Sequence, residues 1–198
     1  MIENLLKIRR GLMFVLSQLK YIDYTKPGKP EIEKDVDGVI INYEITESFT
    51  SSYSELVDTE FLLFDGKNFE MHILSKFKRS DQTNEYPTLI SCMDNVSPWP
   101  GIVIRYEYNE LYIIVNGNNS SRNYYRITTD TNGNVDIKII YKDGVINITN
   151  NGSTIVSNLS VQINLDNISL TLCGEKNENG EVTRVGVATF YEFYIKKI

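Results

Sequence analysis

Residues able to do acid–base or nucleophilic chemistry are sparse in this 198-residue sequence. A single histidine, His72, leaves almost no material for a Ser-His or Cys-His nucleophile pair or for a histidine-based metal site. Glycoside hydrolysis needs two carboxylates at a set separation across the scissile bond. The nearest run of spaced carboxylates, residues 31–37, has Gly38 where a further Glu would be needed, and we interpret it as a solvated charge run. Glu107 and Glu110 flank a predicted hairpin turn and are interpreted in the same way, so we expect no enzymatic activity.

Metal and disulfide chemistry have little support. Cys92 and Cys173 each lie in an apolar, strand-like run without metal-ligand spacing, which predicts buried free thiols. Residues 130–136 (DTNGNVD) alternate oxygen ligands as a calcium loop does, but the glycine is in fourth place and Tyr141 stands where a closing Glu is required. A hairpin turn is the better interpretation there, and also for residues 176–181. We predict no cofactor and name no metal ligands.

Aromatic and arginine side chains offer the clearest binding chemistry. A saccharide site needs an aromatic platform for the apolar face of the sugar and planar polar groups for its hydroxyls. Trp99, the only tryptophan, stands between Pro98 and Pro100, where a core plug and a binding platform are equally good interpretations. The polar stretch 116–123 suits hydroxyl recognition, or is only a loop. The other candidate ligand-binding residues are Arg105, Tyr106, Tyr108, Tyr112, Arg122 and Tyr124. They would line an exposed sheet face, although cross-strand tyrosine pairs often serve stability alone.

Short runs rich in Ile, Val, Tyr, Phe and Thr must position these residues. From Val39 onward the runs alternate with Asn, Asp and Gly turns, of which Asp143-Gly144 and Asn151-Gly152 are strong two-residue hairpin signals. Alternation in residues 136–141 and 145–148 indicates one buried and one wet face, and no repeated βαβ pattern supports a parallel sheet. The sequence predicts an all-β, antiparallel β-sandwich over 39–198. Expected strands cover 39–46, 61–64, 69–78, 88–94, 101–108, 111–116, 124–129, 135–141, 145–150, 153–156, 168–174 and 187–196.

A helical period governs the N-terminus instead. Apolar residues repeat at alternating three- and four-residue spacing, the seam of a coiled coil, at Leu5, Ile8, Leu12, Val15, Leu19 and Ile22. We predict an oligomerisation helix over 1–24; the alternative is a helix that packs on its own sandwich. The Pro-containing segment 25–38 ends the helix and is predicted to be a linker, because neither Pro27 nor Pro30 can continue a helix.

The charge distribution and the N-terminus limit the partners. The formal net charge is −6, and the five Lys/Arg of the first 26 residues leave the remainder still more acidic. Such a body argues against nucleic acid, whose binding depends on neutralising phosphates. No stretch approaches the ~20 apolar residues that span a bilayer, so no membrane insertion is predicted. The apolar run that starts with Leu12–Leu16 is interrupted by Ser17-Gln18, ends at Lys20 and lacks a cleavage site, which predicts no signal peptide and a product made in the cytoplasm.

Four motifs occur in a familiar order: Asp65-Gly66, the hairpin 136–148 with its Asp143-Gly144 turn, Leu170-Thr171-Leu172-Cys173-Gly174, and the closing strand Phe190–Ile195. In this order they resemble the concanavalin A-like lectin/glucanase superfamily, in its laminin-G-like jelly-roll branch, over about residues 61–198. The resemblance implies a jelly-roll β-sandwich. Relatives in this superfamily include calcium-binding members, so calcium stays open.

A short oligomerising helix, a Pro-containing neck and a jelly-roll head together resemble bacteriophage tail-fibre, baseplate or head-fibre proteins. The resemblance implies a homotrimeric, non-catalytic virion appendage. Its helix would contact other virion proteins, and its lectin-like head would recognise cell-surface polysaccharide. A purely structural virion protein without glycan binding is the alternative, and a glycoside hydrolase comes last.

Overall fold

The computed structural model describes residues 30–51, 56–94, 96–118, 122–165, 167–177 and 179–198. Within these ranges the chain is all-β, with one short 3-10 helix, η1 (Arg79–Asp81), and no α-helix. None of the helical structure in this part of the chain is long and apolar enough to cross a membrane. The predicted oligomerisation helix over 1–24 lies outside the described residues and stays a prediction.

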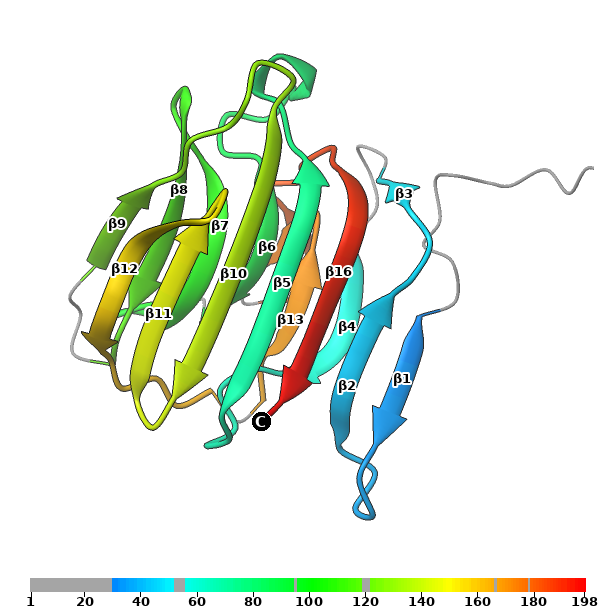
Figure 1. Ribbon diagram of the computed structural model, residues 1–198, viewed down its shortest axis with the longest axis vertical. Helices are drawn as coiled ribbons and strands as arrows, with labels where there is room; N and C mark the ends of the chain where they lie inside the picture. Colours follow the sequence, from blue (N-terminus) through cyan, green and yellow to red (C-terminus); the bar gives the residue numbers. More distant parts are fainter. Residues whose placement is uncertain (1–29, 52–55, 95, 119–121, 166, 178) are drawn as a thin grey trace, which may run out of the picture.

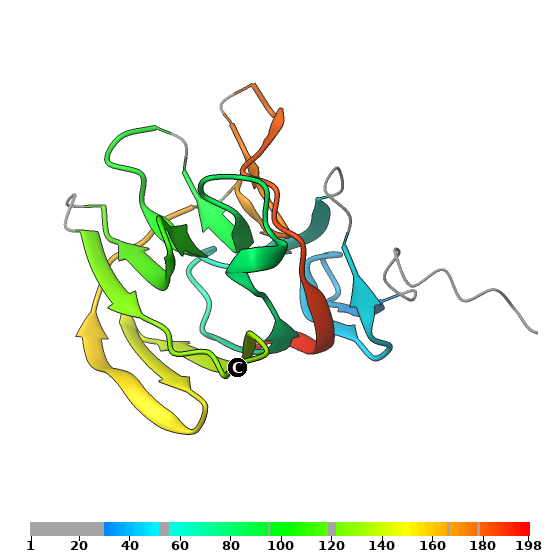
Figure 2. The same ribbon diagram turned by 90° about the horizontal axis from the view of Figure 1, so that it is seen from above.

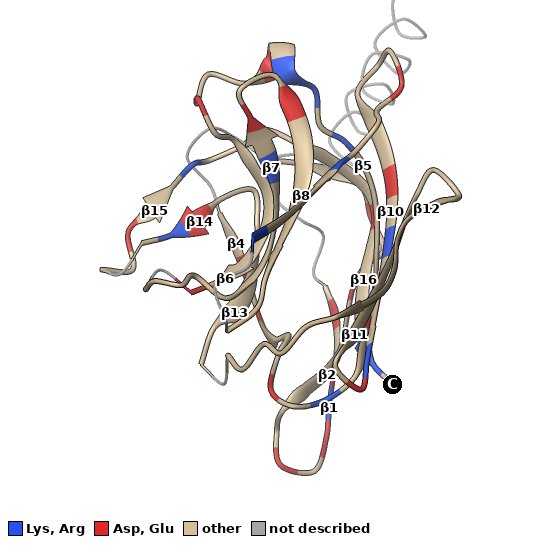
Figure 3. Ribbon diagram, turned by 90° about the vertical axis from the view of Figure 1, so that its left-hand side faces the viewer, with Lys and Arg blue, Asp and Glu red and all other residues tan. Residues whose placement is uncertain are grey.

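Two antiparallel sheets face each other (Figure 1). The larger one has eight strands in the order β1 (Glu31–Lys34), β2 (Ile40–Ile45), β16 (Thr189–Lys197), β5 (Phe69–Lys76), β10 (Asn134–Lys142), β11 (Val145–Asn150) and β12 (Ser153–Ser160), with β3 (Phe49–Thr50) paired to β16. The six-stranded sheet has the order β4 (Val57–Leu62), β13 (Ser169–Leu172), β6 (Thr88–Met93), β7 (Gly101–Glu107), β8 (Glu110–Asn116) and β9 (Arg122–Arg126). A separate hairpin of β14 (Glu175–Lys176) and β15 (Val182–Thr183) projects outside the six-stranded sheet (Figures 2 and 3).

One apolar core fills the space between the sheets. Period-two alternation on β5 sends Phe69, Met71 and Ile73 inward and leaves the residues between them partly exposed, and β10 follows the same rule. Phe49 and Phe190 stack with ring centroids 5.0 Å apart. Full burial of each such side chain is worth roughly 1.5–3 kcal/mol. The predicted antiparallel β-sandwich is confirmed; its jelly-roll connectivity stays a prediction.

The segment predicted to be a linker contains a strand. β1 pairs with β2, with Glu31 opposite Glu44 and Ile32 opposite Tyr43. All four β1 residues are exposed, as expected of a solvated charge run, but their backbone is paired with that of β2. A strand with no buried face gives no apolar alternation in the sequence, which is why the pattern did not reveal it.

The turn and thiol predictions are confirmed. Asp143 and Asn151 adopt positive φ values of 51° and 50° at the β10–β11 and β11–β12 turns. Both cysteines are free and buried, and burial raises the pKa of each thiol to about 12. Asp130 caps its own turn, since its Oδ1 accepts the backbone N–H groups of Asn132 and Asn134, each at 2.8 Å.

Candidate ligand-binding groove

The outer face of the six-stranded sheet carries most of the predicted binding residues. Cross-strand register places them in three rows over β7, β8 and β9. The first row is Arg105, Tyr112 and Arg126; the second is Val103, Ile114 and Tyr124; the third is Gly101, Asn116 and Arg122. Residues of one row lie side by side on one face because side chains alternate between the two faces of a strand.

Trp99 reaches this face from the loop between β6 and β7. Its φ of 56° is uncommon for a bulky residue and costs about 1–3 kcal/mol unless the surroundings impose it. Two hydrogen bonds hold the conformation: Trp99 N donates to Val96 O at 2.7 Å, and Asn116 Nδ2 donates to Trp99 O at 2.9 Å. The tryptophan is 40% exposed, so the core-plug interpretation is wrong.

Gly101 makes the turn from this loop into β7 possible. Its φ of 133° is open to glycine alone, and a Cβ there would lie 2.1 Å from the carbonyl oxygen of Cys92. The close approach of the two backbones brings Pro100 O within hydrogen-bond distance of Asp94 N, at 2.9 Å. Hydrogen bonds therefore join Asp94 to Pro100 across the base of the loop and tie Trp99 to Asn116 of β8.

A groove of about 600 Å³ opens beside Trp99, and we call it the Trp99 groove. Its floor comes from the β6–β9 face and one wall from the β14–β15 hairpin. Its described lining residues are Met93, Asp94, Trp99, Arg105, Ile114, Asn116, Arg122, Tyr124, Glu175, Asn177, Thr183 and Arg184. Aromatic, aliphatic, amide and guanidinium groups thus converge on one concavity, as in sites for small polar ligands.

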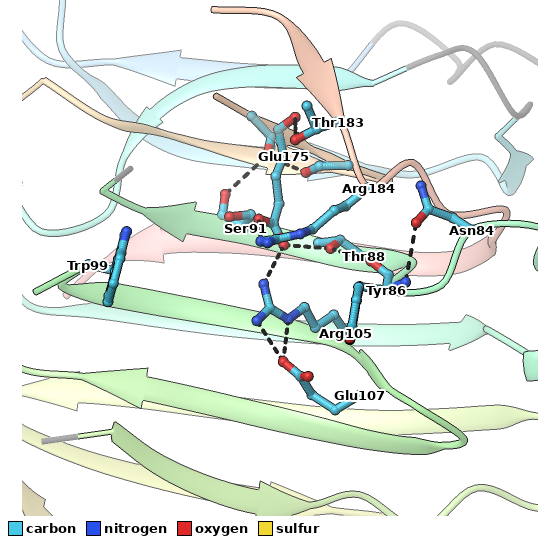
Figure 4. A network of polar contacts seen from close by, with 12 residues as sticks. Asn84, Tyr86, Thr88, Ser91, Trp99, Arg105, Glu107, Glu175, Thr183 and Arg184 are labelled. Atoms are coloured by element: carbon cyan, nitrogen blue, oxygen red, sulfur yellow. Dashed lines mark hydrogen bonds and ion pairs between the residues drawn. The ribbon is translucent and has the colours of Figure 1, made fainter. Parts of the chain in front are cut away.

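A buried carboxylate ties the hairpin wall to the floor (Figure 4). Glu175 is only 5% exposed. Its Oε1 accepts hydrogen bonds from Thr88 Oγ1 at 2.7 Å and Arg105 Nη1 at 3.2 Å, and its Oε2 accepts one from Arg184 Nη1 at 2.8 Å. Arg105 also binds Glu107 Oε1 through Nε and Nη2, at 2.8 and 2.6 Å.

The electrostatics of this cluster favour the charged form of Arg105. Burial of the Arg105 guanidinium opposes its charge, but the facing carboxylates of Glu175 and Glu107 outweigh that effect and raise the pKa of Arg105 above its ordinary value. Because both Glu175 oxygens are occupied, Glu175 is a positioning group for the wall.

The structure brings together four of the seven predicted ligand-binding residues: Trp99, Arg105, Arg122 and Tyr124 all line the groove. Tyr112 lies next to it, in edge-to-face contact with Tyr124 at 6.0 Å between centroids, and its hydroxyl donates to Glu110. The other two residues lie elsewhere.

Tyr106 and Tyr108 are corrections to the predicted surface. Tyr106 is 5% exposed and points into the core, where its hydroxyl donates to Phe77 O at 2.9 Å. Tyr108 is exposed at the β7–β8 turn with a φ of 57°, and its ring faces Tyr86, 6.2 Å away. Two-residue alternation puts Tyr106 on the same face as Ile102 and Ile104, which excludes it from the outer face.

Groove residues that the sequence did not reveal are Asp94, Glu175, Asn177, Thr183 and Arg184. All but Asp94 belong to the β14–β15 hairpin or its ends. The hairpin turn predicted at residues 176–181 is confirmed, but the sequence did not predict that this hairpin would line a groove. Asn116 fell within the predicted polar stretch 116–123, and the structure places it at the end of β8, 1% exposed. Pairing of Glu175 with Arg105 joins positions far apart in the chain, so no local spacing marks it.

Comparisons with known proteins place the fold only. No family model matches this sequence, and no curated protein matches it. Among solved structures, the binding domain of botulinum neurotoxin serotype D is similar with a TM-score of 0.53 and 11% identity, covering 89% of this chain and 49% of that chain.

Two other solved structures have lower TM-scores. One is of botulinum neurotoxin type C, described as dependent upon interaction with two ganglioside molecules to enter cells (TM-score 0.49, 16% identity, 87% of this chain and 42% of that chain). The other is the binding domain of Paraclostridial Mosquitocidal Protein 1 (TM-score 0.48, 14% identity, 85% and 42%). This chain spans less than half the length of all three of these structures.

Proposed function

We propose that this chain is a non-catalytic binding module that holds a saccharide in the Trp99 groove. The observation that carries the proposal is the placement of Trp99, a 40% exposed indole fixed at positive φ beside a concavity lined with amide and guanidinium groups. An aromatic platform with planar polar neighbours is the arrangement that pyranose rings need. The shared fold with a domain described as a binding domain supports a binding role.

The carboxylates of the groove support the absence of catalysis. Hydrolysis of a glycosidic bond needs a proton donor and a second carboxylate across the bond. Glu175 has both oxygens occupied by Thr88, Arg105 and Arg184, and Asp94 uses Oδ1 to accept Val96 N–H at 2.9 Å. Glycan cleavage that disappears in Asp94→Asn would contradict a purely binding role.

The test of saccharide binding is a glycan array with the full chain, followed by calorimetry on the best ligand. Trp99→Ala is expected to weaken binding by about tenfold or more, since ~1.4 kcal/mol corresponds to that factor. Tyr191→Ala is the matched control, because Tyr191 is 45% exposed on β16 of the opposite sheet. Equal affinity of Trp99→Ala and the parent protein would remove the groove from consideration.

We further propose that the module is the head of a homotrimeric appendage of a phage particle. The support is the resemblance to the concanavalin A-like superfamily and the heptad spacing in residues 1–24, which would hold the trimer together and contact other virion proteins. Light scattering after size exclusion tests the assembly: the full chain is expected at three times its monomer mass of 22.8 kDa, and a chain lacking 1–24 at the mass of a single copy. A monomeric full chain would contradict it, and neighbouring genes without capsid or tail proteins would contradict the virion location.

A further inference from the structure

One arginine in the Trp99 groove differs from the other two. Arg105 and Arg184 both form ion pairs with the buried carboxylate of Glu175. Arg122 has its guanidinium carbon 4.5 Å above the Trp99 ring centroid and forms no ion pair with any residue in the described part of the chain. A guanidinium stacked on an indole keeps its in-plane N–H donors free, because the stacking uses only the flat face.

This stack changes what the tryptophan can offer a ligand. Arg122 covers one face of the Trp99 ring, so a neutral sugar cannot lie on that face without displacing the guanidinium. A ligand that carries an acidic group can instead use the pair as it stands, with its carboxylate in the plane of the guanidinium and its ring against the remaining exposed surface of Trp99. The planar fork of arginine matches a carboxylate with two parallel hydrogen bonds.

Asn116 gives a second, independent pointer to a ligand beside Arg122. The two residues are directly opposite each other on β8 and β9. Asn116 is 1% exposed, and its Nδ2 is used to hold the Trp99 carbonyl, while its Oδ1 is buried without a partner among the described residues. An unsatisfied buried acceptor costs roughly 1–3 kcal/mol, which a ligand hydroxyl that reaches the groove floor would recover.

Resting on the proposed function, we infer that the Trp99 groove binds a saccharide bearing a carboxylate, with Arg122 as the anion-binding residue. The remaining charge in the groove is Asp94, whose carboxylate is held by Val96 N–H and has no ion pair in the described structure. The negative charge of Asp94 repels an acidic ligand, so a substitution of Asp94 provides a second test of the inference. The module would then discriminate sugars by charge, within a protein of net charge −6.

The experiment compares each acidic saccharide with a neutral counterpart. The probes are trigalacturonate against its methyl ester, and sialyllactose against lactose, so that uronic and sialic acids are separate arms. Calorimetry with the full chain is expected to show at least one acidic probe binding about tenfold tighter than its neutral partner. The preference is expected to shrink in about 0.5 M sodium chloride, where the Debye length is a few ångströms.

Variants assign that preference to Arg122. Arg122→Ala is expected to erase the difference between acidic and neutral probes, and Asp94→Asn to increase it. Arg126→Ala is the matched control, because Arg126 lies on the same strand and face but outside the groove, paired with Glu110 at 2.9 Å; it is expected to leave the preference unchanged.

Three results would overturn the inference, and the third is distinguishable from the first two. If neutral and acidic probes bind equally while Trp99→Ala still abolishes binding, the acidic ligand class is wrong and the saccharide site stands. The same conclusion follows if Arg122→Ala binds the acidic probes as tightly as the parent protein does, because Arg122 would then not be their anion-binding residue. If no glycan of an array containing both classes binds, the proposed function fails and this inference fails with it.

Discussion

The outer faces of the two sheets both carry many charged side chains, but these side chains are paired and buried differently on the two faces. On the eight-stranded sheet the charges pair across neighbouring strands near the surface. His72 lies between Asp136, 2.8 Å from Nε2, and Glu192, 3.0 Å from Nδ1. Glu70 accepts from Lys138 Nζ at 3.1 Å.

On the six-stranded sheet, in contrast, the ion pair beside the Trp99 groove is largely buried. The β14–β15 hairpin is joined to this face through Glu175, which binds Thr88 and Arg105, and Val103 on the outer side of β7 is fully buried. Glu175 and Arg105 have side chains that are only 7% and 11% exposed. The β14–β15 hairpin forms a wall beside this face, and the wall and the sheet face together form the Trp99 groove.

The comparison teaches how one sandwich separates stability from binding. A flat face of self-paired surface charges presents no concavity and little free hydrogen-bonding capacity, and its exposed ion pairs contribute little energy each. The groove face has buried ions, a strained tryptophan and an unpaired arginine. Buried ions and backbone strain are costly in a structure and cluster at functional sites.

The largest expected effect is at Gly101, which fixes the groove face. Gly101→Ala would place a Cβ 2.1 Å from Cys92 O and 2.6 Å from Met93 Cα, both backbone atoms that cannot move aside. We expect a loss of more than about 4 kcal/mol in the free energy of unfolding, measured by urea titration, or no soluble protein. Gly152→Ala, at the β11–β12 turn of the other sheet, is the control.

Gly152 also has a positive φ, of 75°, but a Cβ there meets nothing within 4 Å. Its substitution is expected to cost only the backbone strain, about 1–2 kcal/mol. Equal losses at the two glycines would mean that the close approach of β7 to β6 does not fix the Trp99 loop.

The next effect is at Glu175. Glu175→Ala leaves Arg105 and Arg184 without their shared carboxylate, and unpairing a buried charge costs about 3 kcal/mol. The corresponding change on the other face, Glu192→Ala, removes an exposed partner of His72 and is expected to cost less than about 1 kcal/mol. Thermal and urea unfolding of the two variants give the comparison directly; a smaller loss at Glu175 than at Glu192 would refute it.

How far the sequence predicts this molecule depends on whether a feature is local. Turn chemistry at Asp143-Gly144 and the alternation along residues 136–141 come from neighbouring residues, so the sandwich strands were predictable. Trp99 between two prolines was recognisable as a loop residue for the same reason. β1 was missed because all its side chains are exposed and leave no apolar period.

The groove itself was predictable only in part. Arg105, Arg122 and Tyr124 were found because exposed aromatic and arginine residues on adjacent strands must share a face. Tyr106 was misassigned because the unbroken apolar run 102–104 hides the phase of the alternation. The hairpin turn at residues 176–181 was predicted, but its position as a wall of the groove was not. Glu175 meets Arg105 only after the chain has folded, and no local sequence pattern near either residue indicates this pairing.

Two tyrosines of the eight-stranded sheet are expected to make the stability of the protein depend on pH in the alkaline range. Burial, with the Tyr194 hydroxyl donating to Glu70 Oε1 at 2.7 Å, raises the pKa of Tyr194 to about 12; burial likewise raises the pKa of Tyr43 to about 12. An acid with a raised folded pKa adds stability that is complete below the unfolded value of 10.0 and is lost as pH rises toward the folded one.

The free energy of unfolding is therefore expected to fall between pH 10 and about 12, in step with tyrosinate absorbance. Tyr194→Phe should make that fall shallower, because it removes one of the groups whose pKa is raised in the folded chain. An unchanged slope would mean that the hydroxyl of Tyr194 is not held by Glu70 in solution.

The smallest expected effect is the sharpest test of which face binds. The double variant Asp136→Asn, Glu192→Gln removes both carboxylates that flank His72 but keeps the shape of the eight-stranded face. Since exposed ion pairs are worth about 0–1 kcal/mol each, stability is expected to change by no more than about 1 kcal/mol. Saccharide affinity is expected to stay within about twofold, because both sites lie on the far side of the core from Trp99. A clear loss of affinity with an intact fold would mean that the ligand binds to the eight-stranded sheet. The buried ion pair of Glu175 and Arg105 on the other face would then serve only to anchor the β14–β15 hairpin.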